Sequence, residues 1–153
     1  MTAQEPRLAE ERDIQDADVL LCSGKEPIGL SPSFCAIEKE PERLKWFRKT
    51  VARRLLWVIR DADVLAGMLV LRHDLDARVV GIDYIVVAEN MRGQGKIGPR
   101  LVRQAQTLAD AELRAEARNP TSRRLLEKCG FQLAEELSSS GHPILTWSRP
   151  YHE

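Results

Sequence analysis

The chain has 153 residues, of which 43% are hydrophobic and 30% charged, values that are ordinary for a soluble globular protein with one domain. Its three cysteines are widely spaced and its longest apolar runs are short, which argues against a disulfide framework, a metal site and a membrane span. The N-terminus is acidic and lacks the apolar core of a secretory signal, so we expect a cytoplasmic protein with a single domain over residues 1–153.

The formal net charge is zero, but the charges are unevenly distributed. Residues 1–20 carry six acids and two bases, whereas residues 92–128 carry nine bases and four acids. The basic segment begins in a glycine-rich turn and therefore favours an anionic ligand there. The alternative is a solvated helix face, which suits Arg103, Arg123 and Arg124 taken singly.

The first forty residues show little periodicity. Residues 1–16 are polar, which predicts a loosely ordered start. The sequence "DVLLC" at residues 18–22 fits a short strand, and the prolines and glycines of residues 23–40 predict a loop. Pro41 then begins an amphipathic helix, because proline suits a first helical turn. The apolar residues with helical spacing are Leu44, Phe47, Val51 and Leu55.

Three apolar runs follow, at residues 55–60, 64–72 and 79–88. Short polar turns separate them, which predicts consecutive antiparallel strands. The third run leads into the glycine-rich turn.

The last third of the chain alternates helix and strand. Apolar residues recur with helical spacing from Ile97, residues 111–118 fit a strand, and residues 119–131 fit a compact helix. Residues 131–137 and 143–150 fit a final strand pair. The whole order predicts a mixed α/β domain with a central, mostly antiparallel, twisted sheet of six to seven strands flanked by helices.

The glycine-rich turn has the sequence "NMRGQGKIGPRL". A nucleotide P-loop would need glycine at Asn90 and serine or threonine at Ile97, so the turn is not one. Its three glycines match the spacing of a dinucleotide-binding turn. However, the strands before it are meander-like, and the acid expected about twenty residues later is missing.

The physical properties of the turn still favour a phosphate. Glycines let the backbone approach a ligand, and the N–H groups at a helix start form an anion cradle. Arg92, Lys96 and Arg100 add positive charge around it. A tight turn without a ligand is the alternative, but three glycines and three bases within nine residues fit it less well.

Two segments resemble the motifs of one family. "VVAENMRGQGKIGPRLV" looks like motif A of the GNAT N-acetyltransferase superfamily, and "ARNPTSRRLLEKCGF" resembles its motif B. The motifs occur in the family's order, with Arg92 and Asn119 27 residues apart. The resemblance covers about residues 54–150 and implies a single acetyltransferase-like domain.

The resemblance implies acetyl-CoA as acetyl donor and an amine as acceptor, with no metal. Backbone amides of the turn would bind the pyrophosphate, the strand before it would pair with the pantetheine arm, and the residue at the start of motif B would hold the region near the thioester. The implied coenzyme-binding residues are Ile85, Val87, Arg92, Gly93, Gln94, Gly95, Lys96, Ile97, Gly98 and Asn119.

Three positions depart from the family pattern. Ile97 stands where glycine or alanine is usual, and the glycine comes one place later, so the loop is longer by one residue or the helix begins late. Ser122 replaces the alanine of motif B. Leu126 replaces the tyrosine that often protonates the departing thiolate, and leucine cannot donate a proton.

An amine must lose a proton before it attacks a thioester, which calls for a general base. Asp83 is the sole acid in the apolar run 79–88 and shares strand parity with Ile85 and Val87, which makes it the catalytic candidate. Many members of the family carry a glutamate near this place. The alternative is a structural acid paired with an arginine. Weaker candidates are Glu116, Tyr84 and His142.

Three functions compete. The first is an acetyl-CoA-dependent N-acetyltransferase that acts on a small amine, a peptide or protein amine, or aminoacyl-tRNA. The second is a non-catalytic acyl-CoA-binding domain, suggested by Leu126 and the altered motif A. The third is a nucleic-acid-binding module, which the neutral composition and the lack of interleaved aromatic residues argue against. A homodimer is among the assemblies that the sequence leaves open.

Overall fold

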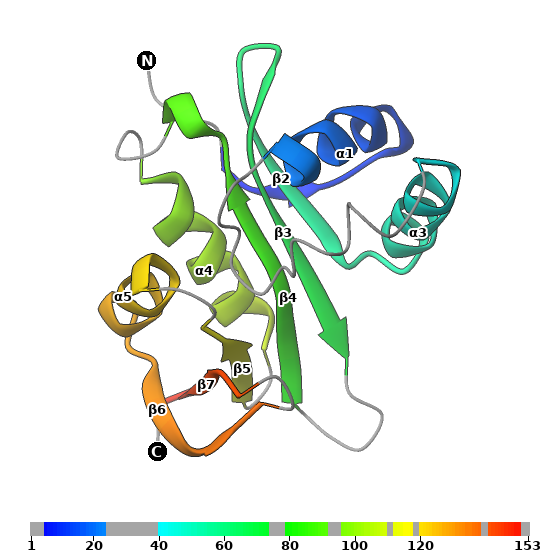
Figure 1. Cartoon of the computed structure of the whole chain (residues 1–153). Helices are drawn as coiled ribbons and strands as arrows, with labels where there is room; N and C mark the ends of the chain where they lie inside the picture. Colours follow the sequence, from blue (N-terminus) through cyan, green and yellow to red (C-terminus); the bar gives the residue numbers. More distant parts are fainter. Residues whose placement is uncertain are drawn as a thin grey trace.

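The computed structural model describes residues 5–23, 40–73, 79–91, 96–109, 112–117, 120–138 and 141–150. Seven strands form one sheet in the order β1-β2-β3-β4-β5-β7-β6 (Figure 1). Every neighbouring pair is antiparallel except β4 and β5, which are parallel. The prediction of a mostly antiparallel sheet of six to seven strands is thus confirmed. The strands are β1 Arg7–Leu8, β2 Leu56–Asp61, β3 Val64–His73, β4 Val79–Val87, β5 Glu112–Glu116, β6 Gln132–Leu137 and β7 Pro143–Ser148.

Within the described part of the chain, four α-helices cover the two faces of the sheet (Figure 1). Helices α4 (Ile97–Leu108) and α5 (Pro120–Lys128) lie on one face, which we call the α4 face. Helices α1 (Ile14–Ser23) and α3 (Glu40–Ala52) lie on the other, which we call the α1 face. Two short 3-10 helices, η1 (Glu11–Asp13) and η2 (Glu89–Met91), precede α1 and follow β4.

The strands send alternate side chains into two apolar cores, as the period of two requires. Ile82 and Ile85 of β4 belong to the core under α4 and α5, together with Leu126 of α5. Val86 belongs to the core under α1 and α3, together with Phe47. Because β4 is buried on both faces in this way, side chains and backbone groups along it lie at the centre of the molecule.

The N-terminal prediction needs correction. Residues 18–22, expected as a strand, lie in α1, and residues 5–16, expected to be loose, contain β1, η1 and the start of that helix. Ile14, Ala17 and Leu21 recur with helical spacing and are buried against the sheet. The longer helical period therefore outweighs the short apolar stretch that suggested a strand. Residues 1–4 and 24–39 lie outside the described part.

A buried carboxylate holds the N-terminal segment to β2. Asp13 is fully buried and accepts hydrogen bonds from the Arg7 guanidinium at 3.0 and 3.1 Å, from Arg60 Nε at 2.9 Å and from the Glu10 amide at 2.8 Å. Burial alone would raise the pKa of Asp13, but these bonds outweigh it and lower the pKa from 3.8 to about 2. Arg60 also binds Asp16 at 2.8 Å, which helps to raise its own pKa.

The hydrogen bonds to Asp13 make the free energy of unfolding depend on pH in the acid range. The folded pKa of Asp13 lies below the ordinary value, so its contribution is complete above about pH 4 and is lost as the pH falls towards about 2. The loss is about 2 kcal/mol of unfolding free energy. We expect denaturant titrations at pH 5 and pH 2 to show that acidification lowers the free energy of unfolding less for Asp13→Asn than for the wild type. Asp63→Asn, at an exposed turn, is the control; equal decreases in all three proteins would contradict the assignment.

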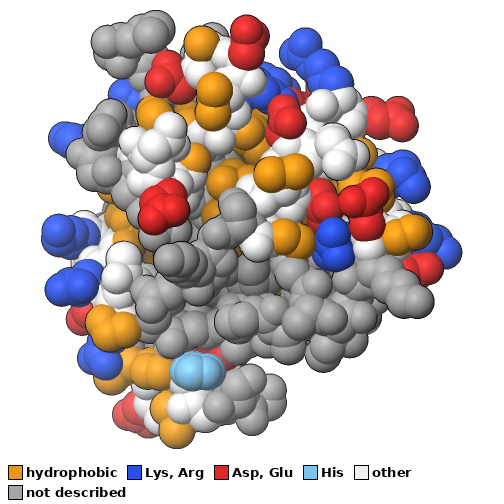
Figure 2. Space-filling model, turned by 45° about the horizontal axis from the view of Figure 1, so that its top comes forward, with side chains coloured by type: hydrophobic (Ala, Val, Ile, Leu, Met, Phe, Trp, Pro, Cys, Tyr) orange, Lys and Arg blue, Asp and Glu red, His pale blue; other side chains and the backbone are white. Residues whose placement is uncertain are grey.

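Charged side chains of both signs lie on the surface. Figure 2 shows basic side chains along the left edge of the view, which is the side of α4 and α5, and others among acidic and apolar side chains at its upper right and right edge. Among the described residues, none of the helices is both long enough and apolar enough to span a membrane.

Candidate functional site

The two central strands separate halfway along the sheet. β4 and β5 pair over four positions, from Val79–Glu112 to Ile82–Ala115. Beyond that point β4 continues beside β3 as far as the pair Gly67–Val87, whereas β5 follows β7. We call the place where they diverge the β4–β5 fork. An extended ligand with amide groups can enter such a fork and follow the backbone of β4 near Ile85, one of the predicted pantetheine contacts.

Helix α4 begins with a backbone turn that suits an anion. Lys96, its N-cap, is in the left-handed conformation (φ 54°, ψ 43°) and makes no side-chain capping bond, and Ile97 is the first helical residue. A left-handed residue followed by a right-handed one turns successive N–H groups towards one point, which creates an anion-binding concavity. The positive end of the helix reinforces it. Pro99 costs nothing here, because a first-turn N–H has no intrahelical partner.

A glycine on β3 lets this helix start lie close to the sheet. A Cβ at Gly67 would lie 2.7 Å from Ile97 Cγ2, 3.1 Å from Leu101 Cδ1 and 3.1 Å from the Val86 oxygen. The bare backbone therefore provides the space into which Ile97 packs, and Ile97 is buried. The predicted departure at Ile97 has a structural reason, since this side chain anchors the first turn of α4.

The glycine that follows also serves packing. A Cβ at Gly98 would lie 3.2 Å from Leu125 Cδ2, so its absence lets α5 approach the start of α4. The helix begins at Ile97 in the structure. The described coenzyme candidates on this turn, Lys96, Ile97 and Gly98, thus lie together at the end of β4. The other predicted contacts, Arg92, Gly93, Gln94, Gly95 and Asn119, lie outside the described residues and stay predictions.

Asp83 lies at an irregularity of β4 that the sequence analysis did not anticipate. Val70 pairs with Tyr84 and Leu71 with Ile82, so Asp83 is an extra residue opposite β3. Such a bulge breaks the alternation of side chains. The expectation that Asp83 shares the face of Ile85 and Val87 is therefore wrong, because those two contact the α4-face core whereas Asp83 lies on the α1 face.

The partner of Asp83 shows which face it occupies. Leu71 points to the α4-face core, so the next residue, Arg72, points to the α1 face. Its Nη1 lies 3.7 Å from Asp83 Oδ1. A Cβ at Gly81 would lie 3.3 Å from the Arg72 guanidinium, so the lack of a side chain at Gly81 lets the guanidinium pack against the backbone of β4. The carboxylate is 31% exposed and hence is not enclosed by apolar neighbours, although Asp83 lies within an apolar run of the sequence.

Aromatic side chains complete this side of the fork. Tyr84 follows Asp83 on β4 and packs against the α1-face core. The Trp46 ring of α3 contacts it edge-on at a centroid separation of 5.7 Å. Helix α3 thereby borders the fork with an aromatic wall that suits the carbon body of a ligand or a cation.

The position of the missing tyrosine is filled by core packing. Leu126 has no exposed surface and belongs to the α4-face core. It offers no proton, as predicted. Burial raises the pKa of the nearby Cys129 thiol, although Arg103 acts in the opposite direction, so this thiol is not activated as a nucleophile at neutral pH.

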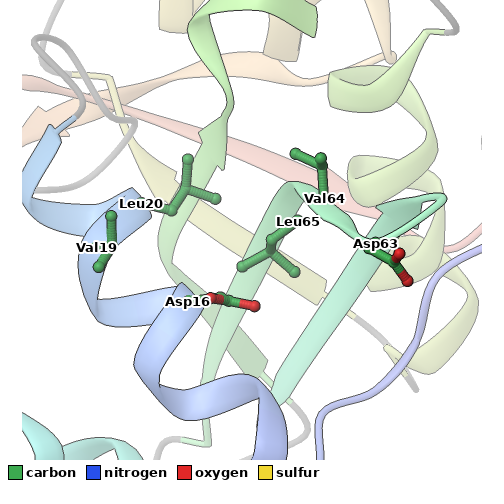
Figure 3. Close-up of a pocket in the computed structure, with 6 residues that line it drawn as sticks. All are labelled: Asp16, Val19, Leu20, Asp63, Val64 and Leu65. Atoms are coloured by element: carbon green, nitrogen blue, oxygen red, sulfur yellow. The ribbon is translucent and has the colours of Figure 1, made fainter.

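A separate hollow of about 320 Å³ lies between α1 and the turn that joins β2 to β3. Figure 3 shows side chains of α1 and of that turn facing one another across it. Asp16 and Asp63 contribute carboxylates, and Asp16 is bound to Arg60. Because carboxylates repel phosphate, this hollow does not suit the diphosphate of a coenzyme. The residues that line it are Asp16, Val19, Leu20, Asp63, Val64 and Leu65.

Sequence reasoning missed two residues of the site, Arg72 and Gly67. Gly67 had a readable signal, since an isolated glycine inside a strand marks a bulge or a close approach of another element. Arg72 had none, because its proximity to Asp83 depends on strand register and on the bulge. Glu116, a weaker candidate from the sequence, ends β5 directly beside the fork.

Comparison with known proteins gives a consistent result. The family model described as "Acetyltransferase (GNAT) family" matches residues 27–131. An N-acetyltransferase from Staphylococcus aureus Mu50 superposes with a TM-score of 0.75 at 16% identity, covering 98% of this chain and 100% of that one. The PaiA N-acetyltransferase from Thermoplasma acidophilum, in complex with coenzyme A, gives 0.66 at 16% identity, with 97% and 99% coverage.

A third solved structure is the Drosophila melanogaster polyamine N-acetyltransferase, which catalyses the formation of N-acetylagmatine. It superposes with a TM-score of 0.67 at 13% identity, covering 94% of this chain and 98% of that one. At these identities the structures share the fold with this chain. A search of the curated proteins gives no match.

Proposed function

We propose, from the premise that this chain belongs to the acetyltransferase (GNAT) family, that it transfers an acetyl group from acetyl-CoA to a primary amine in a ternary complex. The observation that carries the proposal is the fork between β4 and β5 with the anion-binding helix start at its end. An amide-bearing arm that ends in a diphosphate needs these two features side by side. We further propose a cytoplasmic location, where Cys22 and Cys129 would be kept in the thiol form.

The described residues fit the donor substrate. The N–H groups of Lys96, Ile97 and Gly98 supply hydrogen bonds to the pyrophosphate, and the backbone of β4 around Ile85 and Val87 supports the pantetheine arm. We propose that Arg92–Gly95 extend the same cradle and that Asn119 holds the region near the thioester. Acetyl-CoA supplies an activated acyl carbon when it is bound there.

Asp83 is the proposed general base. It directly follows the last β4–β5 pair, which supports a role for its carboxylate near the reacting atoms when both substrates are bound. The ammonium group loses one proton to Asp83, the neutral nitrogen forms the C–N bond, the C–S bond breaks, and the nitrogen releases its second proton to solvent as it becomes the amide. Because Leu126 cannot donate, we propose that the departing thiolate takes its proton from solvent.

A non-catalytic, acyl-CoA-binding function is the second candidate, and one observation favours it. Leu126 is locked in the core, so the residue that often protonates the thiolate in this family is replaced by a packing residue. A thiol is a good enough leaving group that this need not prevent turnover. Release of thiol when an amine is added would indicate the transferase function, and its absence would indicate the non-catalytic one.

The experiment is thiol release from acetyl-CoA across a panel of primary amines, with two variants of Lys96. Lys96→Val disfavours the left-handed backbone and should lower coenzyme A affinity by about tenfold or more, while Lys96→Gly keeps that backbone and should stay within a few-fold of wild type. Calorimetry with coenzyme A gives the affinities. Binding without thiol release for any amine would favour the non-catalytic function, and equal affinities of the two variants would contradict the placement.

A further inference from the structure

A second carboxylate lies at the fork beside Asp83. Ile82 and Ala115 form the last β4–β5 pair, and the residues that directly follow them are Asp83 and Glu116. In a parallel pair these two positions are neighbours on adjacent strands. The fork therefore opens between two acidic residues.

Both carboxylates lie on the α1 face. Leu113, Ala115 and Ala117 belong to the α4-face core, so the intervening Glu116 points to the opposite side. Asp83 is on the same side because it contacts Arg72. One carboxylate oxygen of Glu116, Oε1, is buried, whereas Asp83 remains partly exposed. Both groups therefore lie on the same side of the sheet.

The charges around the fork favour a cation. Arg114, next but one to Glu116 on β5, is held by Glu112 at 3.5 Å and by Glu136 at 3.2 Å. The charge of Arg114 is thereby compensated by these two acids, and the charges that remain at the fork among the described residues are those of Asp83, Glu116 and Arg72. A carboxylate on the ligand would be repelled, and an ammonium group would be attracted. The Trp46–Tyr84 wall adds an apolar surface beside it.

We infer that Glu116 is an acceptor-binding residue that selects an alkyl or arylalkyl ammonium without a neighbouring carboxylate. The inference rests on the proposed function, since it defines the class of amine that the enzyme acetylates. Glu116 and Asp83 hold the ammonium group at the fork, and the carbon body of the amine lies against Trp46 and Tyr84. α-Amino acids are excluded, because their carboxylate would face the two acids.

A matched pair of acceptors tests this directly. 2-Phenylethylamine and phenylalanine differ only in the α-carboxylate, and tyramine and tyrosine form a second such pair. Calorimetric titration into the complex of the protein with coenzyme A measures binding without turnover. We expect the wild type to bind each amine at least about tenfold more tightly than its amino acid, because Asp83 and Glu116 would repel the α-carboxylate of the amino acid.

The variants assign the effect to Glu116. Glu116→Gln should weaken 2-phenylethylamine binding about ten- to hundredfold. The ratio of the affinities for 2-phenylethylamine and phenylalanine should also become smaller. Glu116→Asp keeps the charge on a shorter side chain, so its affinity for 2-phenylethylamine should lie between those of the wild type and Glu116→Gln. Glu112→Gln is the control, because Glu112 lies on the same strand and face but pairs with Val79, away from the fork. It should change binding by less than about threefold.

The outcomes separate this inference from the proposed function. Equal effects of Glu116→Gln and Glu112→Gln, equal binding of 2-phenylethylamine and phenylalanine, or no binding of either amine would overturn the inference. Thiol release that is insensitive to Glu116→Gln would support the transferase function and contradict the role of Glu116 in acceptor binding. Glu116-dependent binding without thiol release would support the acceptor site and contradict the transferase function. Melting temperatures and coenzyme A affinity, both expected to be unchanged, verify that the variants are folded.

Discussion

Asp83→Asn is expected to lower the acetylation rate of a high-pKa amine by roughly two to four orders of magnitude, the usual contribution of a general base. Asparagine keeps the shape of the side chain and its place on the bulge but cannot accept the proton. Coenzyme A affinity should be retained, since the proposed coenzyme contacts lie further along β4 and at α4. A higher pH should recover part of the rate, because solvent then supplies deprotonated amine.

The ion pair with Arg72 provides the control for this prediction. Arg72→Gln removes the same contact but leaves the carboxylate, so it should keep most of the rate if Asp83 acts as base. The pair is 3.7 Å long, and its side chains are 62% and 31% exposed, so its loss should change the unfolding free energy by only about 0–1 kcal/mol. Equal rates and superimposable pH–rate profiles for Asp83→Asn and the wild type would remove Asp83 from the mechanism. Equal losses in both variants would assign the effect to the ion pair.

The sheet could be predicted from sequence because its signals are local. The runs 55–60, 64–72 and 79–88 are apolar, short and separated by polar turns, and each corresponds to a strand of the structure. Helix α4 was equally clear from its apolar period. Helix α1 was not, because residues 18–22 alone resemble a strand and its helical period becomes visible only when Ile14 and Ala17 are included.

The site was only partly predictable, because it depends on how strands align. Asp83 was found as a polar residue in an apolar run, but its face depends on the bulge between the pairs Val70–Tyr84 and Leu71–Ile82. The two adjacent polar positions, Asp83 and Tyr84, were the one trace of that bulge in the sequence. The proximity of Glu116 follows from the parallel register of β4 and β5, which no local pattern encodes.

The clearest link between packing and the proposed site is Gly67. Gly67→Val is expected to lower the unfolding free energy by about 3 kcal/mol, the upper end of the usual range for overpacking. In a protein of this size that corresponds to a decrease in melting temperature of roughly 6–12 °C. A Cβ at this position would overlap Ile97 Cγ2 at 2.7 Å and approach the Val86 oxygen at 3.1 Å, and that backbone oxygen cannot move without disturbing the sheet.

The same change should also weaken coenzyme A binding, because the strain is relieved most easily by moving the first turn of α4 outward with Lys96. Gly81→Ala is the matched control: a Cβ there would meet only the far end of the exposed Arg72 side chain at 3.3 Å, which can shift. It should leave the melting temperature and the coenzyme affinity nearly unchanged. Gly67→Ala combined with Ile97→Leu, which removes the closest methyl group, should recover part of the stability lost by Gly67→Ala alone. If Gly67→Val and Gly81→Ala melt at the same temperature and bind coenzyme A equally, α4 does not depend on the bare backbone of β3 for its position.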